Sequence, residues 1–473
     1  MATIIEQAPL SSSDYNRTPV GQNVMFAVSN NIIVANQIKV KFVAEVHISS
    51  YLPPVPGTTD HLVGTFKTTP NNAGVGMFDF RPIIESYVKA DNLTKGLTAE
   101  YKGVPASKSS YPLHLVDKFS GSNNIMRYLF VNFKVEFLDQ EQYLPGGVTP
   151  NPTFNQLIQR QPEPSESYKI FNGYLKYTDK LDQIGVDYGY NTAPLTLATA
   201  SSSLLTNASV TQYANITDYG TLAFMNINST LKVLFTYYDS DGGSLGSDSV
   251  IREVANGAPQ VWNADIGYEV IHFGCFPANL RNWSSTFQGI VSTISYYTVE
   301  VRSLSPIASL SKTYTININC PTLKGYEPIR LTWLNQWGAW DYYTFTMKSS
   351  RMISTQGSTY NQLAGTWNES SYRIDSFKGG KKAFRVNATE KITMNTDFVN
   401  EAESEWFEDL INSPEVYILD GFQTDQSNAA LNQYVTPVRL TTSSYTRKTV
   451  ANDKLMQYTF EVEKSKTLRT QSV

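Results

Sequence analysis

The chain has 473 residues, enough for about three domains that can each bury a core. Only 17% of its residues are charged, the net charge is −4, and no basic block or stripe occurs, so we expect no sequence-specific nucleic-acid binding. It has no apolar run near the roughly 20 residues that cross a bilayer and no basic, apolar leader, so we expect no membrane partner and synthesis in a cytoplasm.

The first part of the chain is polar and then turns strongly β-patterned. Residues 1–22 predict an extended N-terminal arm, either solvated or lying on a neighbour. Residues 23–140 predict a β-sandwich domain, because 38–48 and 127–137 alternate apolar and polar residues with the period of two of half-buried strands. A short helix is predicted inside 81–89.

A stretch rich in proline and glycine, residues 141–166, predicts a linker to a middle β domain at 167–310. The clearest strand of the middle domain, 230–238, ends in Asp239-Ser-Asp-Gly-Gly-Ser244. This segment also resembles the start of a calcium loop, but its twelfth position is Val250, which cannot act as a ligand. We therefore interpret it as the turn of a β-hairpin.

Metal and disulfide chemistry have few candidate residues. The chain has four histidines and two cysteines, Cys275 and Cys320, too few for a disulfide scaffold. Only His272 and Cys275 stand at a ligand-like spacing, and they alternate with bulky apolar residues as in a strand. Core packing is favoured over a metal site, and no cofactor is expected.

The last predicted domain, 311–463, carries the most distinctive pattern. A strand over 330–335, a tight turn at Asn335–Gly338 and an aromatic strand over 340–347 predict a hairpin with three tryptophans in eight residues. We interpret its aromatic side chains as packing or subunit-interface residues, with an exposed carbohydrate platform as the alternative. The residues concerned are Trp333, Trp337, Trp340 and Tyr342.

One well-patterned helix follows at 399–413, where Ala402, Trp406 and Leu410 form an apolar stripe and glutamates occupy the first turn. Trp406 joins the candidate packing or interface residues. The chain closes with a polar tail, 464–473. The predicted fold class is mainly β: a multi-domain β-sandwich protein, Ig-like or related, with one or two short helices.

No catalytic motif stands out. The chain lacks a Walker loop, a dinucleotide-binding glycine motif, a zinc-protease motif and a nucleophile elbow, so we do not expect an enzyme. A polysaccharide depolymerase needs only two carboxylates. Asp341 and Glu369, which lie near tryptophans, are the residues that this alternative would use.

Several segments resemble virion structural proteins of tailed phages, in particular the ring-forming tail or neck proteins of crAss-like phages. The resemblance covers about the first 140 and last 160 residues. It rests on segments 39–46, 76–88, 330–345, 405–417, 437–448 and 455–461.

The resemblance implies a structural ring layer around the channel through which genome and cargo leave. It also implies a cyclic homo-oligomer, 6- or 12-fold, that contacts other tail, neck or portal proteins. Assembly would take place in the host bacterial cytoplasm and the product would be the virion. A tail-associated receptor-binding module that binds glycans is the alternative function.

Overall fold

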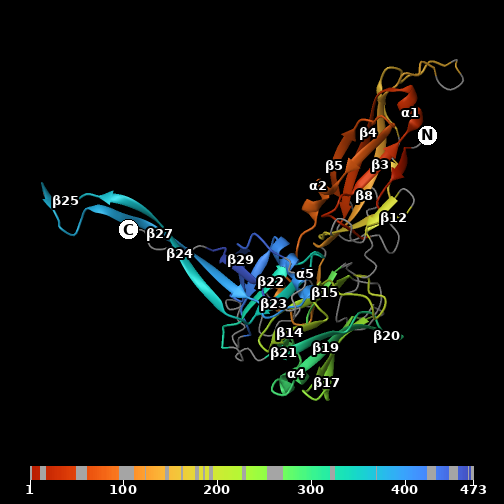
Figure 1. Ribbon diagram of the computed structural model, residues 1–473. Helices are drawn as coiled ribbons and strands as arrows, with labels where there is room; N and C mark the ends of the chain where they lie inside the picture. Colours follow the sequence, from red (N-terminus) through yellow and green to blue (C-terminus); the bar gives the residue numbers. More distant parts are fainter. Residues whose placement is uncertain are drawn as a thin grey trace. The chain divides into compact units, whose positions relative to one another are not determined.

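The computed structural model describes residues 3–10, 17–49, 61–94, 111–122, 124–143, 147, 149–160, 163–175, 181–184, 187–190, 195–225, 231–252, 270–319, 325–368, 370–422, 433–446, 456–466 and 468–469. The protein is mainly β with several separate sheets and short helices, which confirms the predicted fold class. The chain divides into two compact units (Figure 1). Unit 1 comprises Met1–Gln212, Tyr219–Asn317 and Asn335–Asp341, and unit 2 comprises Tyr213–Asp218, Ile318–Leu334 and Tyr342–Val473.

Unit 1 contains a β-sandwich built mainly from the first predicted domain. A sheet with the order β1-β3-β6 packs on a sheet with the order β2-β11-β8-β4-β5, and β9 and β10 add to β8. The bounds are β1 (Ile4–Gln7), β2 (Arg17–Pro19), β3 (Met25–Ser29), β4 (Ile38–Ser49), β5 (His61–Thr68), β6 (Val75–Asp79), β8 (Met126–Leu138), β9 (Leu157–Gln159), β10 (Glu163–Pro164) and β11 (Tyr168–Phe171).

Aromatic rings join the two layers of this sandwich. The ring of Phe26 on β3 lies 5.5 Å from that of Phe133 on β8, and Phe78 on β6 lies 5.8 Å from Phe133. Gly76 on β6 leaves room for the ring of Phe42, because an added Cβ would come within 2.5 Å of it. The alternating residues of β4 and β8 therefore point into one shared core, as the sequence pattern predicted.

The predicted N-terminal arm and linker contribute strands to these sheets. β1 pairs antiparallel with β3, and β2 pairs parallel with β11. β9 and β10, from the predicted linker, pair with β8. Strands of two to four residues are too short to show a period-two pattern, which is why the sequence does not indicate them. Residues 11–16 of the predicted arm lie outside the described residues.

The rest of unit 1 holds most strands of the middle region, whereas Tyr213–Asp218, which includes the end of β14, belongs to unit 2. One sheet has the order β14-β21-β19-β16-β17 with β20 on β19, a second has the order β15-β18-β7, and β12 pairs with β13. The bounds are β7 (Phe119–Ser122), β12 (Leu181–Ile184), β13 (Asp187–Tyr190), β14 (Thr211–Asn215), β15 (Thr221–Met225), β16 (Leu231–Tyr238), β17 (Ser244–Arg252), β18 (Val270–Gly274), β19 (Tyr296–Leu304), β20 (Ile307–Ser309) and β21 (Tyr314–Asn319).

The middle strands include the predicted hairpin and one pairing that was not predicted. β16 and β17 form the predicted hairpin, and in its turn the backbone N–H groups of Asp241 and Gly243 donate to Asp239 Oδ1. β7, from the first predicted domain, pairs with β18 from the middle one. A strand of only four residues is thus added to a sheet whose other members lie far along the chain.

Short helices connect the strands. They are α1 (Asn31–Asn36), α2 (Arg81–Ile84), α3 (Pro277–Trp283), α4 (Ser285–Ile290) and the 3₁₀ turns η1 (Glu85–Tyr87) and η2 (Leu113–Leu115). α2 confirms the predicted short helix, with Pro82 in its first turn and Asp79 Oδ1 accepting from the N–H of Arg81. α1, α3 and α4 were not predicted, because each has at most seven residues and shows less than two turns of helical periodicity.

Unit 2 is organised around one large antiparallel sheet with the order β23-β22-β28-β29-β30-β27-β24, with β31 on β27. The bounds are β22 (Ile329–Leu334), β23 (Trp340–Phe345), β24 (Ser349–Gln362), β27 (Gly380–Asn395), β28 (Val416–Leu419), β29 (Val435–Leu440), β30 (Thr459–Lys464) and β31 (Leu468–Arg469). A separate two-stranded sheet joins β25 (Gly365–Asn368) and β26 (Ser371–Ile374).

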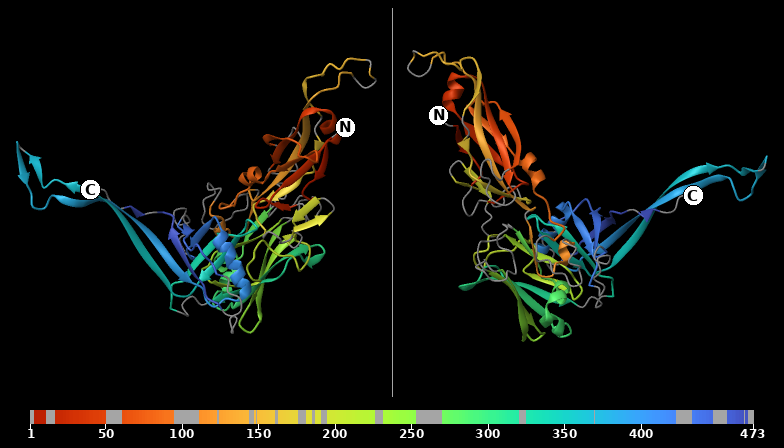
Figure 2. Two further views of the ribbon diagram at one scale, coloured as in Figure 1. Left: turned by 45° about the horizontal axis from the view of Figure 1, so that its top comes forward. Right: turned by 180° about the vertical axis from the view of Figure 1, so that it is seen from behind.

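The predicted helix covers one face of this sheet (Figure 2). It is α5 (Glu401–Asn412), and it begins with a capping box in which Asn400 and Glu403 bond each other's backbone N–H groups. The ring of Phe407 lies 5.3 Å from Phe460 on β30 and 6.4 Å from Phe345 on β23. Helix 399–413 is thus confirmed within two residues at each end.

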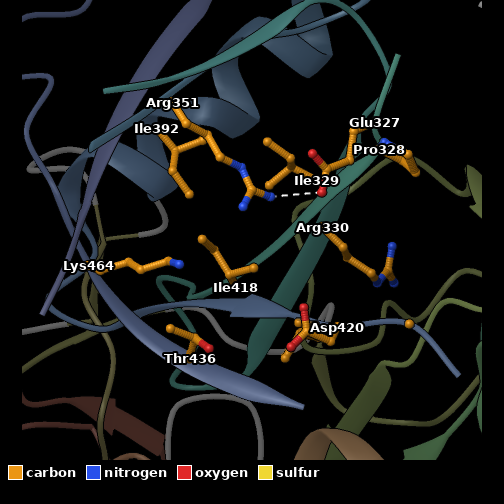
Figure 3. Close-up of a pocket in the computed structure, with 12 residues that line it drawn as sticks. Glu327, Pro328, Ile329, Arg330, Arg351, Ile392, Ile418, Asp420, Thr436 and Lys464 are labelled. Atoms are coloured by element: carbon orange, nitrogen blue, oxygen red, sulfur yellow. Dashed lines mark hydrogen bonds and ion pairs between the residues drawn. The ribbon is translucent and has the colours of Figure 1, made fainter. Parts of the chain in front are cut away.

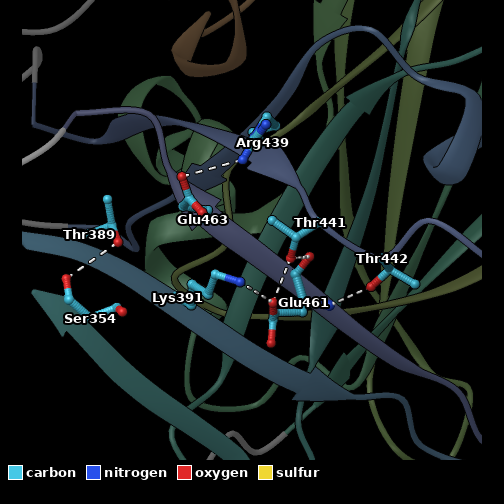
Figure 4. Close-up of polar contacts among 8 residues, drawn as sticks. All are labelled: Ser354, Thr389, Lys391, Arg439, Thr441, Thr442, Glu461 and Glu463. Carbon is cyan, nitrogen blue, oxygen red and sulfur yellow. Dashed lines mark hydrogen bonds and ion pairs between the residues drawn. The ribbon is translucent and has the colours of Figure 1, made fainter. Parts of the chain in front are cut away.

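The opposite face is polar around β27, β29 and β30 (Figure 4). Phe460 and Val462 are buried beneath the helix, whereas Glu461 and Glu463, which alternate with them, bond polar partners. Glu461 accepts from Lys391 Nζ at 3.1 Å and from Thr441 Oγ1 at 2.7 Å. These two hydrogen bonds lower the pKa of the Glu461 carboxyl. At β30 the sheet therefore has one core face and one polar face, whereas every residue of β22 is buried.

Candidate functional site

The aromatic residues singled out from the sequence are all buried. In unit 2 the ring of Trp333 lies 5.0 Å from that of Trp406 on α5, and Tyr342 lies beneath the Arg330 guanidinium at 5.2 Å. Trp333 and Trp406 join strand β22 to the helix. Trp333 and Trp406 therefore pack in the core of unit 2. That they contact another subunit stays a prediction.

The other two tryptophans are buried in unit 1. Trp337 Nε1–H donates to Asn207 Oδ1 at 2.9 Å, and Trp340 Nε1–H donates to the backbone oxygen of Asp91 at 2.8 Å. The His114 ring meets Trp340 edge-on at 4.9 Å. The alternation of the hairpin thus distributes its tryptophans over different neighbours. It does not gather them into one platform.

The turn of the tryptophan hairpin is the predicted one. Gly338 has φ +76°, and the backbone N–H groups of Trp337 and Ala339 donate to Asn335 Oδ1 at 3.0 and 3.1 Å. Of the two carboxylates that a depolymerase would use, the structure describes only Asp341. Asp341 is buried and accepts from Thr206 Oγ1 at 2.5 Å, and Glu369 lies outside the described residues.

His272 and Cys275 form no metal centre in the part of the chain that the structure describes. His272 lies in the middle of β18, is fully buried, and has its pKa lowered to about 3 by that burial. Cys275 is buried, and Cys320 lies outside the described residues. The described residues hold no group of three or more His, Cys, Asp or Glu that could bind a metal ion.

A hollow of about 350 Å³ opens on unit 2 beside the base of β24 (Figure 3). Arg351 extends across it to Glu327 at 2.7 Å and also contacts Glu390 at 3.8 Å, and Lys464 contacts Glu390 at 2.7 Å. Burial raises the pKa of the Asp420 carboxyl at its rim. Since Arg351 and Lys464 are already matched by carboxylates, the hollow is a salt-bridged depression that offers little net charge to a ligand.

The feature of unit 2 that the sequence did not reveal is a long hairpin formed by β24 and β27, residues 349–395. β24 has 14 residues and β27 has 16, and their register runs from Ser349 opposite Met394 to Gln362 opposite Gly380. β30 pairs with β27 only at Lys391–Asn395, and β31 only at residues 387 and 388. Beyond these pairings the hairpin continues as a two-stranded ribbon (Figures 1 and 2).

The long hairpin presents large apolar side chains to solvent along both strands and at its tip. Leu363 and Ile374 are each 75% exposed and Phe377 is 73% exposed, and these are the highest values among the large hydrophobic residues that the structure describes. Ile353, Tyr372 and Phe384 are exposed on the same hairpin. Clustered exposed apolar side chains mark an interaction site.

The hairpin also has an unpaired strand edge. In the described residues β24 is the last strand of its sheet, so its outer edge has no partner over 14 residues, and it carries a single charge, at Arg351. Natural edge strands are usually kept short or protected by charges. A lone two-stranded hairpin is also at best marginally stable in water. The distal part of the long hairpin therefore has neither a third strand nor a core to stabilise it among the described residues.

Positive charge gathers toward the end of the hairpin. The distal segment, residues 370–386, carries five Lys or Arg and one Asp, within a chain of net charge −4. Lys378 Nζ lies 3.8 Å from Asp375 Oδ2, and Lys381 is exposed. No strand was predicted between 348 and 398, where β24 has no buried face and β27 buries only Ala388, Ile392 and Met394. The basic residues of 378–385 were the feature of the sequence that could have indicated an exposed segment here.

No model of a protein family matches the chain, and neither does a curated protein. Among solved structures, native alpha-2-macroglobulin of E. coli aligns with 83% of this chain at 9% identity and a TM-score of 0.17. The chain spans 22% of that protein's length. At such a TM-score the alignment carries no argument about function. Among the described residues, we find no helix that is both long and apolar enough to span a membrane.

Proposed function

We propose that this chain is a structural component of a tailed-phage virion, a subunit of a ring layer in the tail or neck around the channel for genome and cargo. The observation that carries the proposal is the long hairpin. A protein that works alone gains nothing from exposing Leu363, Ile374 and Phe377 on a narrow ribbon, whereas an assembling subunit can bury them against a neighbour.

The sequence resemblance supports the same proposal. Its segments 330–345 and 405–417 overlap β22, β23 and α5, whose aromatic residues Trp333, Phe345 and Phe407 pack together in unit 2. The subunit would therefore use a rigid sheet and helix as its body, and the long hairpin as its contact element. A cyclic ring, 6- or 12-fold, with portal, tail or neck proteins as further partners, is the assembly we infer.

The glycan-binding alternative is not proposed. It rested on an exposed aromatic platform formed by the tryptophan hairpin. Trp333, Trp337 and Trp340 are each at most 2% exposed, so a sugar ring has no access to their faces. Stacking on a sugar needs such an accessible face.

A reconstruction of intact virions tests the function directly. We expect density for one chain repeated with cyclic symmetry between the portal and the distal tail, with the long hairpin in contact with protein. Purified virions that lack this chain, judged by mass spectrometry, would contradict the proposal. A copy number incompatible with a closed ring would contradict it as well.

Variants separate the role of the hairpin from that of the fold. We expect a Phe377→Ser, Leu363→Ser double variant to fold normally and to be excluded from particles. Ile307→Ser is the matched control, because Ile307 is 71% exposed on β20, outside the long hairpin. Incorporation of the hairpin variant at the level of the control would count against an assembly role for this surface.

A further inference from the structure

The distal part of the long hairpin is basic, and helix α5 of unit 2 is acidic. α5 carries four Glu and one Asp and no Lys or Arg, so its net charge is −5. Glu401 and Glu405 are exposed, as are Ala402 and the nearby Phe398, which is 57% exposed. The exposed residues of α5 and of the segment just before it therefore include carboxylates and an aromatic ring.

The distal segment of the hairpin has the complementary composition. Phe377, Phe384 and Tyr372 are exposed beside the basic residues of 378–385. The ring of Phe384 meets that of Tyr360 edge-on at 6.4 Å, and Lys382 Nζ donates to the backbone oxygen of Phe377 at 3.3 Å. Aromatic rings framed by cations match a helix face of carboxylates around a phenylalanine.

A chain cannot make this contact with itself. α5 packs near the base of the hairpin, because Phe407 meets Phe460 and Phe460 is opposite Met394 in the register. From Ser349, opposite Met394, the strand advances eight residues to Gly357, opposite Val386, and thirteen residues to Gln362, opposite Gly380, which is roughly 26 and 43 Å at about 3.3 Å per residue. The distal segment is thus held far from α5 of its own chain, and a complementary α5 must come from another copy.

We propose that the distal segment of the long hairpin, residues 370–386, docks on α5 of a neighbouring copy of this chain. The contact is heterologous: each copy gives a hairpin to one neighbour and offers its α5 to the other. Contacts of this kind close into a ring when their rotation permits. This inference rests on the proposed function and adds the partner, a second copy, and the surface that it contributes.

Charge reversal with rescue tests the contact in the full-length protein. Lys381→Glu with Lys382→Glu, and separately Glu401→Lys with Glu405→Lys, should each weaken self-association at least tenfold, as measured by sedimentation. The two sets combined should restore association. Lys39→Glu with Lys41→Glu is the matched control, since both lysines are exposed on β4 of unit 1, and it should associate like the parent protein.

Cross-linking locates the contact without relying on charge. A photoreactive phenylalanine analogue at position 377 should give covalent dimers whose cross-linked peptides map to 398–412. The same analogue at Phe154, exposed in unit 1, should not label that peptide. Raising salt from 0.1 to 1 M shortens the screening length from about 10 to about 3 Å and should reduce the dimer yield.

The outcomes separate this inference from the proposed function. Self-association that is unchanged by both charge reversals would contradict docking on α5. Cross-links from position 377 that map elsewhere on a second copy would contradict it as well. Neither result would contradict the ring assembly. A chain that stays monomeric and cross-links only within itself would overturn the second copy as partner. The virion reconstruction then decides the function independently.

Discussion

Arg330 Nη1 lies 3.3 Å from Asp218 Oδ2 inside unit 2, with only 4% and 6% of the two side chains exposed. Thr344 Oγ1 bridges them, accepting from Arg330 at 2.8 Å and donating to Asp218 at 2.8 Å. The pair is joined to the aromatic core, because the guanidinium lies over the Tyr342 ring. Each charge is satisfied by several groups, and loss of one member leaves the other buried.

Arg330→Ala should therefore destabilise unit 2 strongly. Removing one member of a buried ion pair costs about 3–5 kcal/mol of unfolding free energy. Urea denaturation followed by tryptophan fluorescence measures the loss. Arg439→Ala is the control, because Arg439 is 72% exposed and lies 3.5 Å from Glu463, and exposed pairs contribute less than about 1 kcal/mol. Equal losses in the two variants would contradict the buried pair as a major element of stability.

Gly338→Ala should be much more harmful than Gly380→Ala. Both glycines have positive φ, +76° and +78°, so alanine is strained at either by about 1–2 kcal/mol. At Gly338 an added Cβ would also lie 2.2 Å from the backbone oxygen of Asn172, whereas nothing lies within 4 Å at Gly380. We expect thermal unfolding to reveal an additional loss, about 1–3 kcal/mol, for Gly338→Ala. Matching melting curves would show that the turn can relax.

His272 should make unit 1 less stable in acid. Burial lowers its pKa to about 3, against 6.5 when exposed. Between those pH values the unfolded chain binds one proton more than the folded chain, so this group reduces the unfolding free energy as pH falls, by about 1.4 kcal/mol per pH unit. In His272→Leu the pH profile of stability should be flatter by that slope. Parallel profiles for the two proteins between pH 6.5 and 4 would refute the assignment.

Trp406→Ala should destabilise the packing of α5 on the sheet. The Trp406 ring lies 5.0 Å from Trp333 and 5.4 Å from Phe407, and it is almost fully buried. Truncating a buried tryptophan costs about 3–5 kcal/mol. Phe398→Ala removes an exposed ring next to the same helix and should cost less than about 0.5 kcal/mol. A Trp406 variant as stable as Phe398→Ala, by urea denaturation, would contradict the core assignment.

The elements predicted from the sequence are those with one buried face. β4, β8 and β16 alternate with a period of two because one side of each strand enters a core, and α5 shows an apolar stripe because it lies on a sheet. The turn at Asn335–Gly338 was predictable from its glycine. The long hairpin was not predicted, since β24 has no buried face and β27 buries only Ala388, Ile392 and Met394, toward the base of the hairpin.

Local sequence thus determined the longer strands and the helix that bury one face, because burial imposes a repeat on the residues that pack. It did not determine which strands share a sheet. β7 with β18, β2 with β11, and the distribution of Trp333, Trp337 and Trp340 over different neighbours depend on contacts between residues far apart in the chain. Strands pair through backbone groups that every residue has, so the sequence does not specify the partners. Only the tertiary structure decided which strands pair, and only it showed that the long hairpin is exposed.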